Sequence, residues 1–188
     1  MNGRLVAEDD AVIPVTDHGL LYGDGVFEGI RFYHRRAFRL AAHLRRLSDS
    51  ARAIGLDLPC QRQELVKAVE EIIAAFPEEE GYLRLMLTRG SGPMGLDPAG
   101  CTRPNLILIA TRLEMVHPEL RRDGIRLMVA ATRRLPPDGL DPRIKSLNYL
   151  NHILARMEAG RAGADEAVLL NAQGRLAEAS AENLFLVR

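Results

Sequence analysis

Cysteine and net charge are both scarce in this chain of 188 residues. Its two cysteines, Cys60 and Cys101, lie far apart and form no CxxC pair. That excludes a disulfide scaffold and a thiolate zinc site, and it points to a reducing compartment. Lys and Arg total 25 and Asp and Glu total 25, so the chain has no net charge. Proteins that bind the nucleic-acid backbone carry a basic excess, so we expect no nucleic-acid partner.

Neither a membrane segment nor a targeting signal is visible in the sequence. No apolar run reaches the ~18–20 residues that a membrane helix needs. The first ten residues, MNGRLVAEDD, are polar and acidic, unlike a secretory or transit peptide. We therefore expect a cytoplasmic protein with no membrane partner.

Several common catalytic motifs are missing as well. The five histidines are scattered, with no HExxH motif and no ligand spacing, so we expect no metal site. The glycines of YGDGVFEG and RGSGPMG match neither GxGxxG nor a phosphate-binding P-loop. There is also no GxSxG motif of a serine hydrolase.

Lysine is rare, which makes the two lysines that occur informative. Among the 25 basic residues only Lys67 and Lys145 are lysines. Lys67 lies off the apolar stripe of a predicted helix, four residues before Glu71, as expected for a solvated face. Lys145 follows a segment in which Pro142 disfavours helix, and it precedes a helical pattern. A lysine at such a junction can point into a cleft and act as an amine nucleophile. This argument leaves a catalytic and a structural Lys145 equally open.

The apolar pattern alternates short strand-like runs with helices. We predict helices over 44–54, 61–76 and 148–161, and strands over 4–7, 11–15, 25–33, 82–89, 105–111, 125–132, 165–170 and 183–187. The polar stretch 112–123 is the predicted linker. It separates a small N-terminal domain, 1–116, from the first part of a larger domain, 124–188.

A lysine alone does not make a pyridoxal phosphate site. The cofactor also needs a cation for its phosphate, a hydrogen-bond partner for its ring oxygen and an acid facing its ring nitrogen. Arg46 is a candidate for the phosphate, since arginine binds phosphate through two parallel hydrogen bonds. Tyr149, four residues after Lys145, shares its face if a helix starts there, and could reach the ring oxygen. Glu178 or Glu182 could face the ring nitrogen.

Each of these candidates also has an ordinary structural explanation. Arg46 falls on an arginine-rich amphipathic helix, Tyr149 could be a core tyrosine, and the two glutamates could be solvated. Spacing by itself does not decide between the two interpretations.

Five segments together resemble the class IV aminotransferases, the fold type IV pyridoxal phosphate enzymes. The family includes branched-chain aminotransferases, D-amino acid aminotransferases and 4-amino-4-deoxychorismate lyases. The segments run through nearly the whole chain: TDHGLLYGDGVFEGIRFY, FRLAAHLRRLSDSARAIGL, GYLRLMLTRGSGPMGLDP, DPRIKSLNYLNHILARMEA and ADEAVLLNAQGRLAEASAENLF. As an ordered set they are highly specific, although any one alone would not be.

The resemblance implies the fold and the cofactor site. The fold would be α+β and D-amino acid aminotransferase-like, a small α/β domain followed by an incomplete pseudo-barrel domain. Lys145 would carry pyridoxal 5'-phosphate as a Schiff base and move the proton of the substrate α-carbon. Arg46 would bind the phosphate, Tyr149 the ring oxygen and Glu178 the pyridine nitrogen.

The resemblance also implies a substrate. The substrate-binding residues would be Tyr22, Phe27, Tyr82 and Arg84, with Arg84 offering a charge to a carboxylate such as that of glutamate. VFEGIRFY, the Tyr82–Arg84 pair and KSLNYLN look most like branched-chain aminotransferases. The expected reaction is transfer of the amine of a branched-chain amino acid to 2-oxoglutarate, by a homodimer. A 4-amino-4-deoxychorismate lyase and a D-amino acid aminotransferase are the alternatives.

Two departures from the family pattern bear on this prediction. Ala179 follows Glu178 where family members often have glycine. The family also extends well beyond the length of this chain, and its further part completes the larger domain and the phosphate site. We therefore expect a fragment of a longer protein, for which an inactive truncated chain is a third alternative.

Overall fold

The computed structural model describes residues 1–113 and 122–187, which form two compact units. The first unit contains Met1–Leu113 together with Ile144–Leu147, and the second contains the remaining described residues. Most of the predicted linker, 112–123, lies outside the described residues. The domain boundary therefore stays a prediction.

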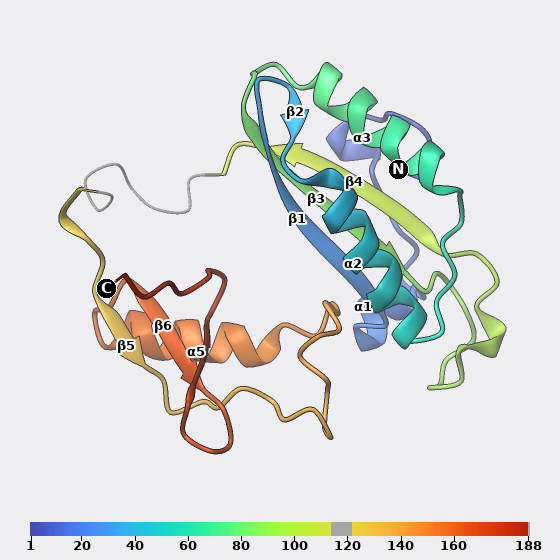
Figure 1. The fold of residues 1–188 in the computed structure, drawn as a ribbon. Coiled ribbons are helices and arrows are strands. Elements are labelled where there is room, and N and C mark those ends of the chain that lie inside the picture. Colours follow the sequence, from blue (N-terminus) through green and yellow to red (C-terminus); the bar gives the residue numbers. More distant parts are fainter. Residues whose placement is uncertain (114–121, 188) are drawn as a thin grey trace. The chain divides into compact units, whose positions relative to one another are not determined.

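The first unit is built on a four-stranded antiparallel sheet in the order β2-β1-β3-β4 (Figure 1). The strands are β1 (Gly25–Tyr33), β2 (Arg36–Ala37), β3 (Gly81–Thr88) and β4 (Asn105–Thr111). His34 and Arg35 turn β1 into β2, and both have positive φ values of 47° and 57°. Two such residues form the tight turn that suits the twist of a two-stranded hairpin.

Two helices cover one face of this sheet. They are α2 (Leu40–Ala53) and α3 (Arg62–Ala75). Their apolar side chains, such as Leu47 and Val69, form one core with alternate residues of the strands, such as Ile30 and Leu85. The predicted helix over 61–76 is confirmed, and it starts at a capping box between Gln61 and Glu64.

The strand alternation assigns the other residues of β1 and β3 to the uncovered face. In the register of the sheet, Gly29 lies opposite Arg84, and Arg31 lies opposite Tyr82. A Cβ atom on Gly29 would collide with the Tyr82 hydroxyl, so a larger residue at position 29 would require the tyrosine ring to move.

The second unit has a three-stranded sheet in the order β5-β6-β7. Its strands are β5 (Leu127–Val129), β6 (Glu166–Leu170) and β7 (Leu176–Ala179). Helix α5 (Leu150–Arg161) packs against β6 through small residues, including Ala155 and Ala159, which are fully buried (Figure 1). Among the described residues no helix is long and apolar enough to cross a membrane.

Three strand predictions are wrong. Residues 4–7 and 11–15 contain no strand and flank a short 3-10 helix, Glu8–Asp10. Residues 183–187 are also irregular. Their apolar side chains are mostly exposed, as at Val15 with 77% and Phe185 with 88%. A strand needs a neighbour to pair its backbone groups, and no described strand pairs with these runs.

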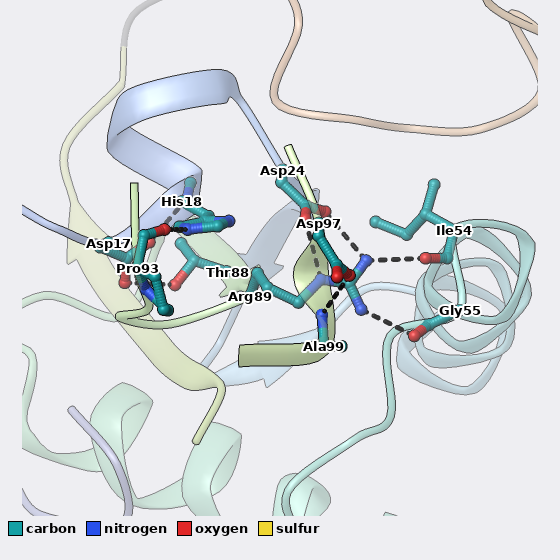
Figure 2. A network of polar contacts seen from close by, with 11 residues as sticks. Asp17, His18, Asp24, Ile54, Gly55, Thr88, Arg89, Pro93, Asp97 and Ala99 are labelled. Atoms are coloured by element: carbon teal, nitrogen blue, oxygen red, sulfur yellow. Dashed lines mark hydrogen bonds and ion pairs between the residues drawn. The ribbon is translucent and has the colours of Figure 1, made fainter. Parts of the chain in front are cut away.

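A polar network ties the ends of the first unit's elements together (Figure 2). Buried Asp17 caps α1 (His18–Tyr22) by accepting from the Gly19 backbone, and it also accepts from the Thr88 hydroxyl at the end of β3. Arg89 follows β3 and forms two hydrogen bonds with Asp24 at 2.8 and 3.0 Å. It also donates to the carbonyls of Ile54 and Gly55 at the end of α2, both at 2.7 Å.

Arg89 is therefore expected to hold the end of α2 to the sheet. The Arg89→Ala variant should lower the free energy of unfolding by about 3–5 kcal/mol, because it leaves Asp24 and two carbonyls without their cation. Urea unfolding measures the loss. The matched control is Arg52→Ala, since the Arg52 side chain is 81% exposed and pairs with exposed Asp49; it should change stability by less than about 1 kcal/mol. Equal effects of the two variants would contradict the assignment.

Candidate active site

The segment around Lys145 is bound to the edge of β1. The Phe27 backbone donates to the Lys145 carbonyl at 2.9 Å, and the Leu147 backbone donates to the Gly25 carbonyl at 2.9 Å. The Lys145 backbone N–H donates to the hydroxyl of buried Ser50, on α2, at 3.1 Å. Lys145 thus has a fixed backbone although it lies outside any regular helix or strand.

The Lys145 side chain lies against the ring of Phe27. Its Nζ atom is 4.4 Å from the ring centroid, and the guanidinium carbon of Arg84 is 3.4 Å from the same centroid. Phe27 is 2% exposed. Tyr82 is on the same face, across Gly29. The structure therefore brings four of the predicted site residues together on the uncovered face of the sheet.

Arg46 lies on the helical side of the sheet. Its Nε and Nη2 atoms donate to the two carboxylate oxygens of Glu28 at 2.5 and 2.7 Å, and His43 Nδ1 lies 2.8 Å from Glu28 Oε2. Glu28 is fully buried, whereas the Arg46 side chain is 52% exposed. Arg46 precedes Ser50 by one helical turn, so the two share a face of α2 near the Lys145 backbone.

Tyr22 is held by a loop. Its hydroxyl accepts from the Gly95 backbone at 3.0 Å, and its ring stands edge-on to His18. This contact places the Tyr22 hydroxyl against the turn-rich segment that follows β3.

The remaining predicted site residues belong to the second unit. Tyr149 is the N-cap of α5, not a helical residue, so the prediction that Lys145 and Tyr149 share a helical face is wrong. Pro142 and the pairing with β1 keep the chain extended past Lys145. The Tyr149 ring stacks on the imidazole of His152, with centroids 4.4 Å apart and planes 15° apart.

Glu178 is on β7 and has two cationic or donor neighbours. His152 Nε2 lies 3.2 Å from Glu178 Oε1, and Arg134 forms an ion pair with the same oxygen. The hydrogen bond from His152 and the charge of Arg134 lower the pKa of Glu178, against the opposing effect of burial. Glu178 therefore stays ionised at neutral pH.

Glu182, the alternative acid, has the opposite environment. Burial, together with the neighbouring carboxyl of Glu166, raises the pKa of Glu182 to about 7. Glu166 is 6% exposed and accepts from the Ala167 and Ser180 backbones. A carboxyl group with a pKa of about 7 is partly protonated near neutrality, so Glu182 is the poorer permanent anion.

Some residues of these clusters carry no clear signal in the sequence. Glu28, His43, His152 and Arg134 have no motif of their own and stand only as charged or polar letters inside predicted elements or loops. The apolar alternation of β1 does give one signal, because Glu28 occupies a position on the core face. An acid at such a position needs a buried partner.

A hollow of about 790 Å³ lies elsewhere in the first unit. Its lining includes Cys60, Glu64, Arg103 and Asn105, and no predicted site residue. Among the described residues no group of histidine, cysteine or acidic side chains could hold a metal ion.

One family of proteins matches most of the chain. Residues 25–188 match the family described as Amino-transferase class IV, and the chain belongs to that family.

Several individual proteins are similar to this chain. The chain is 46% identical to a putative branched-chain-amino-acid aminotransferase of Methanocaldococcus jannaschii over 188 residues, which is 100% of this chain and 64% of that protein. It thus spans less than two thirds of this relative's length. The crystal structure of a T.th. branched-chain amino acid aminotransferase complexed with N-(5'-phosphopyridoxyl)-L-glutamate is 35% identical, with a TM-score of 0.91 over 100% of this chain and 63% of that one.

A third similar structure has a different activity. The 4-amino-4-deoxychorismate lyase of Pseudomonas aeruginosa is 30% identical, with a TM-score of 0.78 over 96% of this chain and 63% of that one. These structural matches confirm the α+β, D-amino acid aminotransferase-like fold expected from the sequence.

The carboxyl pair leads to a prediction about pH. The pKa of Glu182 is raised from 4.5 to about 7, so the folded chain keeps a proton that the unfolded chain loses. The stability from this group is complete below about pH 4.5 and is lost as the pH rises through about 7. Relative to Glu182→Gln, the native protein should therefore lose stability between about pH 5 and about pH 8.

Urea unfolding at both pH values measures this difference. Glu71→Gln is the matched control, because Glu71 is 62% exposed and pairs with Lys67 on the surface. A Glu182→Gln variant with the same pH dependence as the native protein would refute the raised pKa of Glu182.

Proposed function

We propose that this protein is a pyridoxal phosphate-dependent aminotransferase that transfers the amine of a branched-chain amino acid to 2-oxoglutarate. The observation that carries the proposal is the position of Lys145. Two backbone–backbone hydrogen bonds hold its segment to β1, and a third, from the Lys145 N–H to the Ser50 hydroxyl, holds it to α2. Its amine lies beside the ring of Phe27. Membership of the class IV family supports a catalytic interpretation of this lysine.

The donor groups of this chain fit pyridoxal phosphate. A lysine supplies the amine that attaches to an aldehyde, and an arginine supplies the cation for a phosphate. The ionised carboxylate of Glu178, whose pKa is lowered by His152 and Arg134, suits a protonated ring nitrogen. The phosphopyridoxyl glutamate in the similar T.th. structure supports the same cofactor.

Each residue has a separate role in this proposal. The bound cofactor supplies an electron sink for the charge that develops at the substrate α-carbon. Lys145 would hold the cofactor, and its amine would take the proton from the substrate α-carbon and return one. Arg46 would bind the phosphate, Tyr149 would hold the ring oxygen, and Glu178 would keep the ring nitrogen protonated.

The uncovered face of the first sheet would receive the substrate. Phe27, Tyr82 and Tyr22 would shape the proposed site for a branched side chain, with buried Phe27 as its floor. Arg84 offers a cation for the distal carboxylate of glutamate or 2-oxoglutarate. The names of the relatives support this substrate class, and the glutamyl group of the T.th. complex supports glutamate as the second product.

The two lysines of the chain allow a matched test of covalent attachment. Lys145→Ala in the full-length protein should abolish the yellow colour of bound pyridoxal phosphate and its trapping by borohydride, because no amine remains for the aldehyde. Lys67→Ala should change neither, since Lys67 is 77% exposed on α3. Absorbance and the mass of the reduced protein measure both. Colour and trapping that persist in Lys145→Ala would refute the assignment.

The substrate is tested by product analysis. Full-length protein mixed with leucine and 2-oxoglutarate should form glutamate and the oxo acid of leucine in equal amounts. Chromatography of both products checks the balance. Turnover of D-alanine in place of leucine would assign the protein to the D-amino acid enzymes instead.

A lyase is the second candidate, because a 4-amino-4-deoxychorismate lyase is among the similar structures. Both reactions use the same cofactor residues. Release of pyruvate from aminodeoxychorismate without any amine acceptor would favour the lyase over the aminotransferase.

The proposal includes a cytoplasmic homodimer, by analogy with the family. The free cysteines Cys60 and Cys101 are compatible with a reducing compartment. Light scattering of the full-length protein should give twice the mass of one chain, and a monomer at working concentrations would contradict this part of the proposal.

A further inference from the structure

His152 is a buried polar residue to which the proposed reaction assigns no role. It lies on α5, and its side chain is 6% exposed. Its Nδ1 atom is buried and has no hydrogen-bond partner among the described residues. A buried imidazole with one unpaired nitrogen costs free energy, so its other contacts must compensate.

Both of these contacts are to residues that the proposed function places against the cofactor. On one side the imidazole stacks on the Tyr149 ring at 4.4 Å, with planes 15° apart. At its edge, Nε2 lies 3.2 Å from Glu178 Oε1. A carboxylate only accepts, so Nε2 is the donor of this hydrogen bond. The stacking fixes the plane of the imidazole and therefore the direction of this N–H.

Glu178 needs such a constraint more than a core residue does. Its side chain is 40% exposed and has several rotatable bonds. It projects from β7, a strand of only four residues. His152 and Arg134 both contact Oε1 of Glu178, and neither of these two contacts uses Oε2. Arg134 is itself fixed, because its backbone donates to the Leu170 carbonyl of β6 at 2.9 Å.

We propose that His152 is a positioning residue that holds the Glu178 carboxylate in the orientation in which its second oxygen receives the protonated ring nitrogen of the cofactor. This inference rests on the proposed function. It assigns His152 no contact with substrate or cofactor, and its effect on the cofactor passes through Glu178.

The test compares two ligands that differ only at the ring nitrogen. They are pyridoxal phosphate and its deaza analogue, in which a C–H group replaces that nitrogen. Titration of the full-length apoprotein gives a dissociation constant for each, and the ratio of the two constants isolates the ring-nitrogen contact. Any general damage to folding lowers both affinities and leaves the ratio unchanged.

Two variants separate the donor from the bulk of the side chain. His152→Phe keeps a ring to stack on Tyr149 but removes the N–H, and it should reduce the preference for pyridoxal phosphate by about tenfold, as for one charge-assisted hydrogen bond. His152→Gln keeps an N–H donor and should restore most of the preference. Adding His152→Phe to Glu178→Gln should change the ratio no further.

The outcomes are distinct. A ratio unchanged in His152→Phe, or reduced equally in His152→Gln, overturns the positioning role while the proposed function stands. A further loss when His152→Phe is added to Glu178→Gln also overturns it, because His152 would then act independently of Glu178. A native protein that binds neither ligand overturns the proposed function, and this inference with it.

Discussion

The register of β1 is the constraint on which the first unit depends. Strand residues alternate between faces, so β1 directs Val26, Ile30 and Phe32 into the core under α2 and α3. Its other face carries Phe27, beside the Lys145 amine and the Arg84 guanidinium. Its edge receives the Lys145 segment. A slip of one residue would exchange the faces. It would turn the core residues away from α2 and α3 and turn Phe27 toward these helices, so fold and candidate site are specified together.

Environment, not residue type, separates the two candidate acids of the second unit. Glu178 and Glu182 are four residues apart and chemically identical. A histidine donor and an arginine lower the pKa of the first, whereas burial beside a second carboxyl raises the pKa of the other to about 7. A permanent anion that stabilises a protonated ring nitrogen must not take up that proton itself. The contrast between these environments supports the choice of Glu178 in the proposed mechanism.

Elements with a strong apolar period could be predicted from the sequence. Helix α3 and the strands β1, β3 and β4 fall close to their expected ranges, because each buries one face against the others. The runs at 11–15 and 183–187 have similar letters, but a strand also depends on a neighbour that no local pattern reveals. The extended backbone around Lys145 could not be predicted either, because it too depends on a distant neighbour. Its pairing with β1 joins residues more than a hundred positions apart, so spacing suggested a helical face where the chain is extended.

Three of the four residues that the proposal places against the cofactor contact a buried polar side chain. Ser50 accepts from the Lys145 backbone, Glu28 pairs with Arg46, and His152 donates to Glu178. Burying a serine, a glutamate and a histidine costs stability that apolar residues would not. The cost has a function if these buried residues hold Lys145, Arg46 and Glu178 in place before a ligand arrives. Immobilising a long side chain during binding would otherwise weaken the affinity for the ligand. The sequence motifs identify the proposed cofactor-binding residues. Their buried neighbours Ser50, Glu28 and His152 can be recognised only from the packing, so the structure is needed to find the residues that orient the site.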